Sequence, residues 1–355
     1  MARNRIIPLF IPHAGCPCAC VFCDQKKITG MDTPVTPDDV AEIVSSASGI
    51  DVKKLDAEES QRLAHLEEAL PWAGEGCQLA FYGGSFTAMK PETQETLLGA
   101  AEPYLRDGRI ESIRLSTRPD AVDSETVARL KAYGVTTVEL GCQSMDNRVL
   151  RLSGRGHTRE DTIRASTLLY QGGLDQVLQM MTGLPGDNGE ASVATAKALI
   201  ALNPQGVRIY PTVVLKNTEL HRMMLRGDYQ PQSVESAVAL CAGLYELFLA
   251  ADIPVIRVGL NPTEELSGGE AVAGAYDPAL GERVLSRMYR NRAEKLLSRQ
   301  PEMKDAVFYV HPRRISVMVG QKRENTCYLR ERFGLSSIKV RPIGGAEWDI
   351  FLKNQ

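Results

Sequence analysis

Four cysteines crowd into one short segment near the N-terminus, where their thiolates could bind a soft metal. The run CPCACVFC contains Cys16, Cys18, Cys20 and Cys23, and the other four cysteines stand singly far along the chain. A zinc site usually takes four ligands in two separated pairs. Three thiols spaced CxxxCxxC instead suit a cubic 4Fe–4S cluster whose fourth iron stays open to another ligand. The spacing therefore predicts a cluster held by Cys16, Cys20 and Cys23, with Cys18 as the competing ligand.

The elements around this loop alternate between short apolar runs and amphipathic stretches. The runs predict buried parallel strands at 6–13, 78–84, 110–117, 135–141, 175–183, 206–212 and 254–260. Helices are predicted between them, at 91–106, 123–133, 159–172, 189–202 and 233–251. Strand–helix alternation of this kind builds a parallel sheet that closes fully or partly into a barrel. Loops that follow the strands should then meet at one mouth, and the cysteine loop follows the first strand.

The cysteine loop resembles the signature of the radical S-adenosylmethionine (SAM) superfamily, with Phe22 as the aromatic residue before the last cysteine. The resemblance implies an α/β fold, a partial (βα)6-type TIM barrel. It also implies that the open iron chelates SAM, and that an electron from the cluster splits SAM into methionine and a 5′-deoxyadenosyl radical. The family more often has another residue type at the place of Cys18, which favours Cys16, Cys20 and Cys23 as the ligands.

Motifs after the later strands resemble the places where this family contacts SAM. They contribute the residues Gly83, Gly84, Ser85, Ser116, Thr117, Arg118, Gln143 and Arg155. Glycine lets a backbone approach a ligand without a Cβ clash, and arginine can pair with a carboxylate. Ser85 is a departure, because the family usually has Glu there. Thr158 precedes an acidic pair and predicts a helix N-cap.

Longer segments resemble one branch of the superfamily, the elongator catalytic subunit, whose members modify wobble uridines in tRNA. The similarity covers roughly residues 5–260 and is carried by VELGCQSMDNRVLRLSGRGHT, MMTGLPGD and RIYPTVVLKNTELHRMMLRGDY. The segments IPHAGCP and FYGGSFTA look more like shorter bacterial relatives of that subunit. Only about 90 residues follow the predicted barrel, too few for the acetyltransferase domain of the subunit. Use of an acetyl donor is therefore left open.

Composition and charge divide the chain into two predicted parts, residues 1–265 and 266–355. The first is the barrel, with a helical insertion at 31–75, and the second is an α+β extension. Residues 281–355 hold 16 Lys and Arg against 8 Asp and Glu, whereas the rest holds 25 against 36. Part of the basic excess clusters at Arg313, Arg314, Lys322, Arg323, Arg330 and Arg332. Such a cluster could follow RNA phosphates, and it could equally be a solvated surface.

Three functions are compatible with these features. The first is a radical SAM enzyme that modifies RNA, with a tRNA base as the substrate and flavodoxin or ferredoxin as the electron donor. The second is a radical SAM enzyme acting on a peptide or small metabolite. The third is a non-catalytic, metal-stabilised scaffold or RNA-binding protein. We expect a cytoplasmic protein without membrane contact, because the sequence has neither a signal peptide nor a stretch of about 20 apolar residues.

Overall fold

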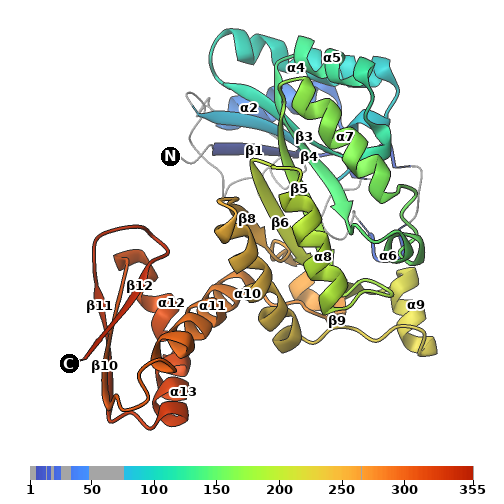
Figure 1. Ribbon diagram of the computed structural model, residues 1–355. Coiled ribbons are helices and arrows are strands. Elements are labelled where there is room, and N and C mark those ends of the chain that lie inside the picture. The colour runs from blue at the N-terminus through green and yellow to red at the C-terminus, as the bar shows by residue number, and fades with distance from the viewer. Residues whose placement is uncertain are drawn as a thin grey trace.

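A seven-stranded parallel sheet dominates the computed structural model, which describes residues 5–12, 14–16, 20–24, 33–47, 76–264 and 266–354. Its strands are β1 (Arg5–Phe10), β2 (Cys77–Tyr82), β3 (Ser112–Thr117), β4 (Val135–Gln143), β5 (Asp175–Thr182), β6 (Gly206–Pro211) and β8 (Val255–Val258). Their order in the sheet follows their order in the chain. Each crossover therefore steps to the next neighbour in the same direction, and the sheet curls into a half-barrel (Figure 1).

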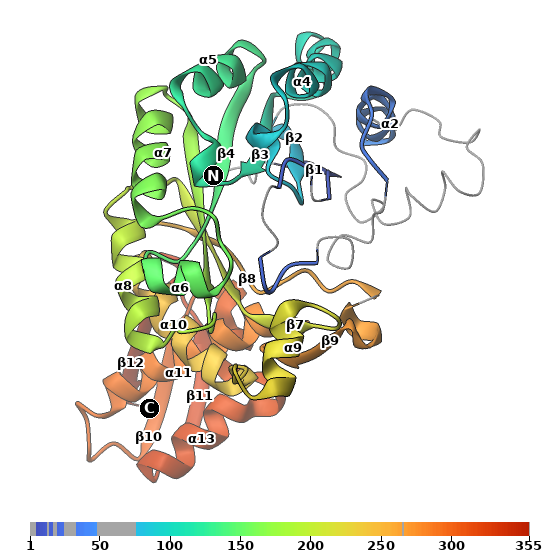
Figure 2. The same ribbon diagram turned by 90° about the vertical axis from the view of Figure 1, so that its right-hand side faces the viewer.

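The helices that link these strands cover the outer face of the sheet (Figure 2). They are α4 (Pro91–Arg106), α5 (Ser124–Ala132), α7 (Arg159–Gln171), α8 (Gly189–Ile200) and α10 (Val234–Ala250). Shorter helices α6 (Asn147–Leu152) and α9 (Glu219–Arg226) lie near the strand ends. All five predicted linking helices and all seven predicted strands are confirmed. The predicted cap of α7 is confirmed too, since Thr158 and Asp161 form a reciprocal capping box.

The predicted insertion after the first strand is described only in part. Helix α2 (Pro37–Ala47) packs on α4 through the buried residues Val40, Ile43 and Val44. Residues 31–32 and 48–75 of this insertion lie outside the described residues. In addition, β7 (Val213–Leu215) and β9 (Ala271–Gly274) form a small antiparallel pair beyond the end of β6.

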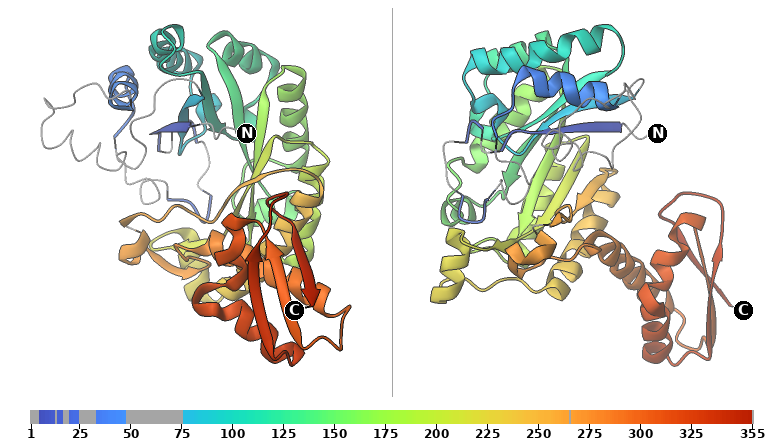
Figure 3. Two further views of the ribbon diagram at one scale, coloured as in Figure 1. Left: turned by 90° about the vertical axis from the view of Figure 1, so that its left-hand side faces the viewer. Right: turned by 180° about the vertical axis from the view of Figure 1, so that it is seen from behind.

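The C-terminal region is a separate α+β layer joined to the half-barrel by α11 (Leu280–Leu297) (Figure 3). It contains a three-stranded sheet in the order β11 (Ser337–Pro342), β10 (Asp305–Val310), β12 (Ile350–Asn354). Helices α12 (Ile315–Val319) and α13 (Glu324–Phe333) pack with α11 beside it. One buried apolar cluster runs from the half-barrel into this layer, where it includes Met303, Phe308 and Leu329. The division after residue 265 therefore stays a prediction.

Among the described residues, no helix is both long enough and apolar enough to cross a membrane.

Candidate functional site

The cysteine loop lies at the carboxyl ends of the strands and is held there by backbone hydrogen bonds on both sides. The amide of Val21 donates to the carbonyl of Ser153 (3.1 Å), and the carbonyl of Val21 accepts from the amide of Leu220 at the start of α9 (2.7 Å). Phe22 packs with Val21 against an apolar cluster that contains Leu220 and Tyr229. The predicted ligands Cys16, Cys20 and Cys23 are half-buried thiols in this loop. Cys18 lies outside the described residues.

Two glycines allow the cysteine loop and the loop after β2 to stack backbone against backbone. Gly15 has φ +71°, and a Cβ atom there would lie 2.3 Å from the carbonyl oxygen of Ser85. A Cβ atom on Gly84 would lie 2.6 Å from the carbonyl oxygen of Ile11. The amide of Ser85 donates to the carbonyl of Ala14 (2.8 Å), which joins the two loops. Glycine at position 84 is therefore required by contact with the protein's own chain. Gly83 (φ +87°) makes the preceding turn.

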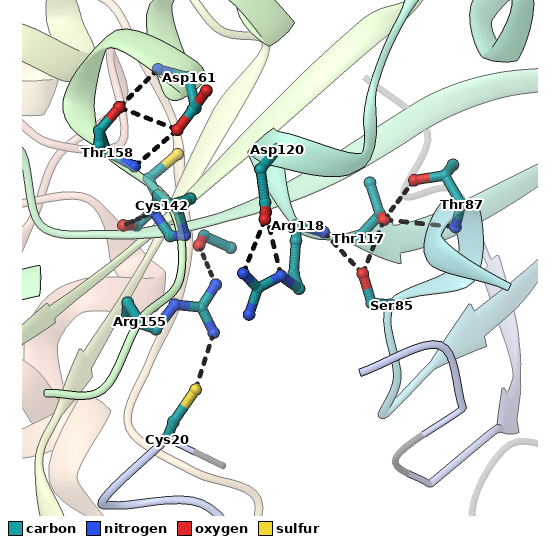
Figure 4. Close-up of polar contacts among 12 residues, drawn as sticks. Cys20, Ser85, Thr87, Thr117, Arg118, Asp120, Cys142, Arg155, Thr158 and Asp161 are labelled. Carbon is teal, nitrogen blue, oxygen red and sulfur yellow. Dashed lines mark hydrogen bonds and ion pairs between the residues drawn. The ribbon is translucent and has the colours of Figure 1, made fainter. Parts of the chain in front are cut away.

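Two of the predicted SAM-binding hydroxyls point into the protein. Ser85 is fully buried, and its Oγ lies 3.2 Å from Thr117 Oγ1 and accepts a hydrogen bond from the amide of Arg118 (3.2 Å). Thr117 Oγ1 also lies 2.6 Å from Thr87 Oγ1 (Figure 4). These contacts fix the turn that carries Arg118. Ser116 faces the other way because side chains alternate along a strand, and its hydroxyl donates to the carbonyl of Phe81 (3.4 Å).

Arg155 joins the cysteine loop to the end of β4. Its Nη1 lies 3.4 Å from Cys20 Sγ, and its Nη2 donates to the carbonyl of Gly141 (2.7 Å) (Figure 4). Its Nε is buried and has no hydrogen-bond partner among the described residues. Arg118 instead forms a bidentate pair with the carboxylate of Asp120 (3.0 and 2.8 Å). Burial opposes the charge of Asp120, but the hydrogen bonds from Arg118 hold its pKa below the usual value.

Strand β4 ends in a bulge that places Gln143 in a left-handed conformation. The register with β5 shifts between Leu140 and Gln143, and Gln143 has φ +63°. Such strain persists only where the surroundings impose it, and it concentrates at functional sites. The side-chain carbonyl of Gln143 accepts from Gln179 Nε2 (3.2 Å). The bulge thus directs an amide side chain along the inner face of the sheet.

His157, which follows the bulge, is buried in its neutral form. Burial and the positive charge of Arg155 lower its pKa to about 4. Its Nε2 lies 3.0 Å from the carbonyl oxygen of Cys142, so this nitrogen carries the proton and donates. Its Nδ1 has no hydrogen-bond partner among the described residues. We refer to Cys20, Gly141, Arg155 and His157 as the mouth residues.

Deeper in the half-barrel lies an ion network that the sequence analysis missed. Glu139 on β4 binds Arg114 Nη1 (2.9 Å) and Arg208 Nε (2.8 Å), and it accepts a hydrogen bond from the hydroxyl of Tyr82 (2.8 Å). Burial opposes the charge of Glu139, but the two arginines keep its pKa below the usual value. Tyr82, Arg114, Glu139 and Arg208 are called the inner ion network below. The sequence feature that could have revealed this network is the presence of charged residues inside otherwise apolar strand segments.

The three half-buried thiols of the loop form a donor set whose chemistry suits an iron–sulfur cluster. Among the residues that the structure describes, no three His, Cys, Asp or Glu side chains converge to hold one metal ion. A cubic cluster spreads its ligands, because each cysteine binds a different iron. Burial, with Cys20 and Cys16 nearby, raises the pKa of the Cys23 thiol to about 12.

Comparisons with known proteins agree with this geometry. Residues 10–199 match the family model of the radical SAM superfamily, and residues 204–290 match that of the radical SAM C-terminal domain. A tRNA uridine(34) acetyltransferase of Methanocaldococcus infernus is 31% identical over 181 residues, which cover 45% of this chain and 34% of that protein. Elongator complex protein 3 of Homo sapiens is 30% identical over 138 residues, which cover 38% of this chain and 25% of that protein. The matched part therefore covers only 34% and 25% of these relatives.

A solved structure shares the fold. The archaeal Methanocaldococcus infernus Elp3 with an N-terminal deletion gives a TM-score of 0.58 at 22% identity. The alignment covers 83% of this chain and 64% of that chain. At this identity the likeness establishes the curled parallel sheet with its outer helices.

Proposed function

This chain belongs to the radical SAM superfamily, and we propose that it cleaves SAM reductively at a 4Fe–4S cluster and uses the resulting 5′-deoxyadenosyl radical to modify a tRNA base. The family match covers residues 10–199, more than half of the chain. The protein is accordingly a radical SAM enzyme. The cleavage itself, the substrate and the modified base belong to the proposal.

The observation that carries the proposal is the bridge made by Arg155. One guanidinium nitrogen contacts the sulfur of Cys20 and another binds the carbonyl of Gly141. The cysteine loop is thereby joined to the strand end where Gln143 adopts its strained conformation. A site that must hold a cluster and a nucleoside cofactor together needs such a link, because the distance and orientation between the reacting atoms must be fixed.

Each group of residues has a distinct task in this proposal. Cys16, Cys20 and Cys23 would hold the cluster, which when bound supplies the electron that breaks the sulfonium bond of SAM. Arg155 places its guanidinium beside the sulfur of Cys20 and ties it to the end of β4. Gln143 offers an amide on the inner face of the sheet, where SAM would lie.

Ser85 and Thr117 receive a positioning role in place of the cofactor contact expected from the sequence. Their hydroxyls bind each other, and Ser85 also holds the amide of Arg118. They fix the turn from which Arg118 approaches the site. The backbone of Gly83 and the hydroxyl of Ser116 stay proposed contacts to SAM.

The tRNA substrate is proposed from the relatives, which are named tRNA uridine(34) acetyltransferase and Elongator complex protein 3. Acetyl transfer is not part of the proposal, since the matched segment covers at most about a third of those proteins. A flavodoxin or ferredoxin would supply the electron, and we place the reaction in the cytoplasm.

The test is formation of 5′-deoxyadenosine by protein purified without oxygen, with its cluster reconstituted and reduced by dithionite. Mass spectrometry should detect deoxyadenosine with the wild type and none with Cys20→Ala. Cys327→Ser is the matched control, because Cys327 is an exposed thiol on α13 outside the loop, and it should keep the wild-type rate.

The substrate is tested by adding bulk tRNA and following hydrogen loss or a mass change in its digested nucleosides. Faster deoxyadenosine formation with tRNA supports the proposal. Deoxyadenosine without any change in tRNA would favour a peptide or small metabolite as the substrate. Absence of deoxyadenosine both with and without tRNA, from protein that binds iron and sulfide, would contradict the radical chemistry.

A further inference from the structure

A groove of about 330 Å³ opens on the C-terminal layer, between the α12–α13 connection and the outer strand β11. It is lined by Val319, Arg323, Thr326, Ile338, Lys339, Val340 and Arg341, and is called the C-terminal groove below. Strand β11 pairs with β10 on one side only, so its other edge is unpaired among the described strands. Figures 1 and 3 show α12 and α13 packed along one face of this sheet.

Apolar and basic side chains line the groove together with Thr326, and none of the lining residues is acidic. Val319, Ile338 and Val340 are the apolar residues of the lining, called the apolar floor, and Arg323, Lys339 and Arg341 are its basic residues. Because side chains alternate along a strand, Lys339 and Arg341 lie on the opposite face of β11 from Ile338 and Val340. Lys339 and Arg341 are exposed on β11. The surrounding segment 312–342 has eight Lys and Arg against two Glu. A ligand that complements this groove is a flexible polyanion with flat apolar faces.

The connection between α12 and α13 presents two basic residues in a strained but well-held turn. Lys322 has φ +48° and Arg323 has φ +65°, which non-glycine residues rarely adopt, and both side chains are exposed. Buried Asn325 fixes the turn by donating from Nδ2 to the carbonyls of Ser286 (2.9 Å) and Val317 (3.2 Å). Gly320 has φ +77° and allows the backbone of Asn325 to come close. A Cβ atom on residue 320 would lie 3.0 Å from the backbone nitrogen of Asn325.

We propose that the C-terminal groove binds a single-stranded segment of RNA, with phosphates against Lys322 and Arg323 and bases on the apolar floor. A duplex is a poorer fit, because its stacked bases hide the faces that an apolar floor would contact. KH modules clamp the backbone of about four nucleotides with a short glycine-containing loop between two helices. Here Gly320–Arg323 takes that place, and Arg323 adopts a left-handed conformation where a glycine would be usual. The choice of RNA rests on the proposed function, whereas the binding requires no cluster.

Fluorescence anisotropy of the full chain tests this groove directly. The probe is a labelled single-stranded RNA of about 12 nucleotides, with a duplex of the same length for comparison. One variant, Lys322→Asp with Arg323→Asp, reverses the loop charge with a residue that tolerates positive φ. A second variant, Lys339→Glu with Arg341→Glu, reverses the charge on β11.

A matched control reverses two charges elsewhere. Lys131 and Lys197 are exposed on helices α5 and α8 of the half-barrel, so Lys131→Glu with Lys197→Glu changes the net charge equally. We expect each groove variant to lose affinity at least about tenfold and to lower the slope of log K against log salt by about 2. The control should stay within about twofold of the wild type.

The outcomes separate this inference from the proposed function. Wild-type affinity in both groove variants, or equal loss in the control, would overturn the groove as the RNA site. Duplex binding as tight as single-strand binding would overturn the claim of single-strand preference. If single-stranded RNA binds and the variants lose it while no deoxyadenosine ever forms, the groove stands and the radical proposal fails. Should the loop variant fail to fold, as judged by its melting temperature, the β11 variant decides.

Discussion

The inner ion network and the mouth residues are neighbouring polar layers of one half-barrel, yet their hydrogen bonds are satisfied to different extents. Both carboxylate oxygens of Glu139 have partners, supplied by Arg114, Arg208 and Tyr82. In contrast, Arg155 Nε and His157 Nδ1 are buried without a partner among the described residues. A buried polar group without a partner costs free energy, and a ligand that bonds to these two atoms would recover that cost.

This difference separates a layer that stabilises the fold from a layer that is kept ready for a ligand. Removing a group from the inner ion network should change stability most. Removing a mouth residue should change activity most.

Glu139→Gln should lower the free energy of unfolding by about 3–5 kcal/mol, because it leaves Arg114 and Arg208 buried without a carboxylate. Thermal or urea unfolding measures the change. The matched control is Glu246→Gln, which breaks a more exposed pair with Arg292 and should cost about 1 kcal/mol or less. If the two variants lowered the free energy of unfolding equally, the inner ion network would contribute no more to stability than a partly exposed ion pair.

His157 should make the protein less stable as pH falls from about 6.5 to about 4. Its pKa is lowered to about 4 in the fold, so over this range the unfolded chain binds a proton that the folded chain does not. The loss is on the order of 3 kcal/mol at the acid end. Unfolding midpoints measured across this range should vary less for His157→Gln than for the wild type. Identical pH profiles would show that His157 titrates normally.

Arg155→Met should slow deoxyadenosine formation about 100-fold, since one positioned donor in an active site is worth about that much. The melting temperature should change little, because only one hydrogen bond to protein oxygen is lost. Arg148→Met, an exposed arginine on α6, is the control and should keep the wild-type rate. A rate within about threefold of the wild type in Arg155→Met would place Arg155 outside the reaction.

Thr158→Ala should cost about 1 kcal/mol of stability and leave deoxyadenosine formation unchanged. The hydroxyl of Thr158 caps α7 together with Asp161, and loss of an N-cap typically has this effect. Thr158 lies one residue after a mouth residue, so a large loss of activity would extend the mouth further along the chain than we infer.

The curled parallel sheet was predictable from local sequence alone. Short apolar runs alternating with amphipathic stretches have few ways to bury their surfaces other than a parallel sheet under helices. The seven strands of the parallel sheet and the linking helices α4, α5, α7, α8 and α10 lie where this periodicity placed them. Cys16, Cys20 and Cys23 could be predicted as ligands from the sequence because three cysteines in one loop need no long-range contact to be recognised.

The tertiary structure decided which polar residues face which side. The sequence predicted Ser85 and Thr117 as contacts to SAM. In the structure their hydroxyl groups lie within hydrogen-bond distance of each other. Glu139, Arg114 and Arg208 are 25 to 94 positions apart in the chain and meet only because neighbouring strands bring them to one face. Likewise, the C-terminal groove exists because β11 lies beside the turn at Arg323. Contacts between distant segments depend on register and curvature, which the local pattern of apolar and polar residues does not encode.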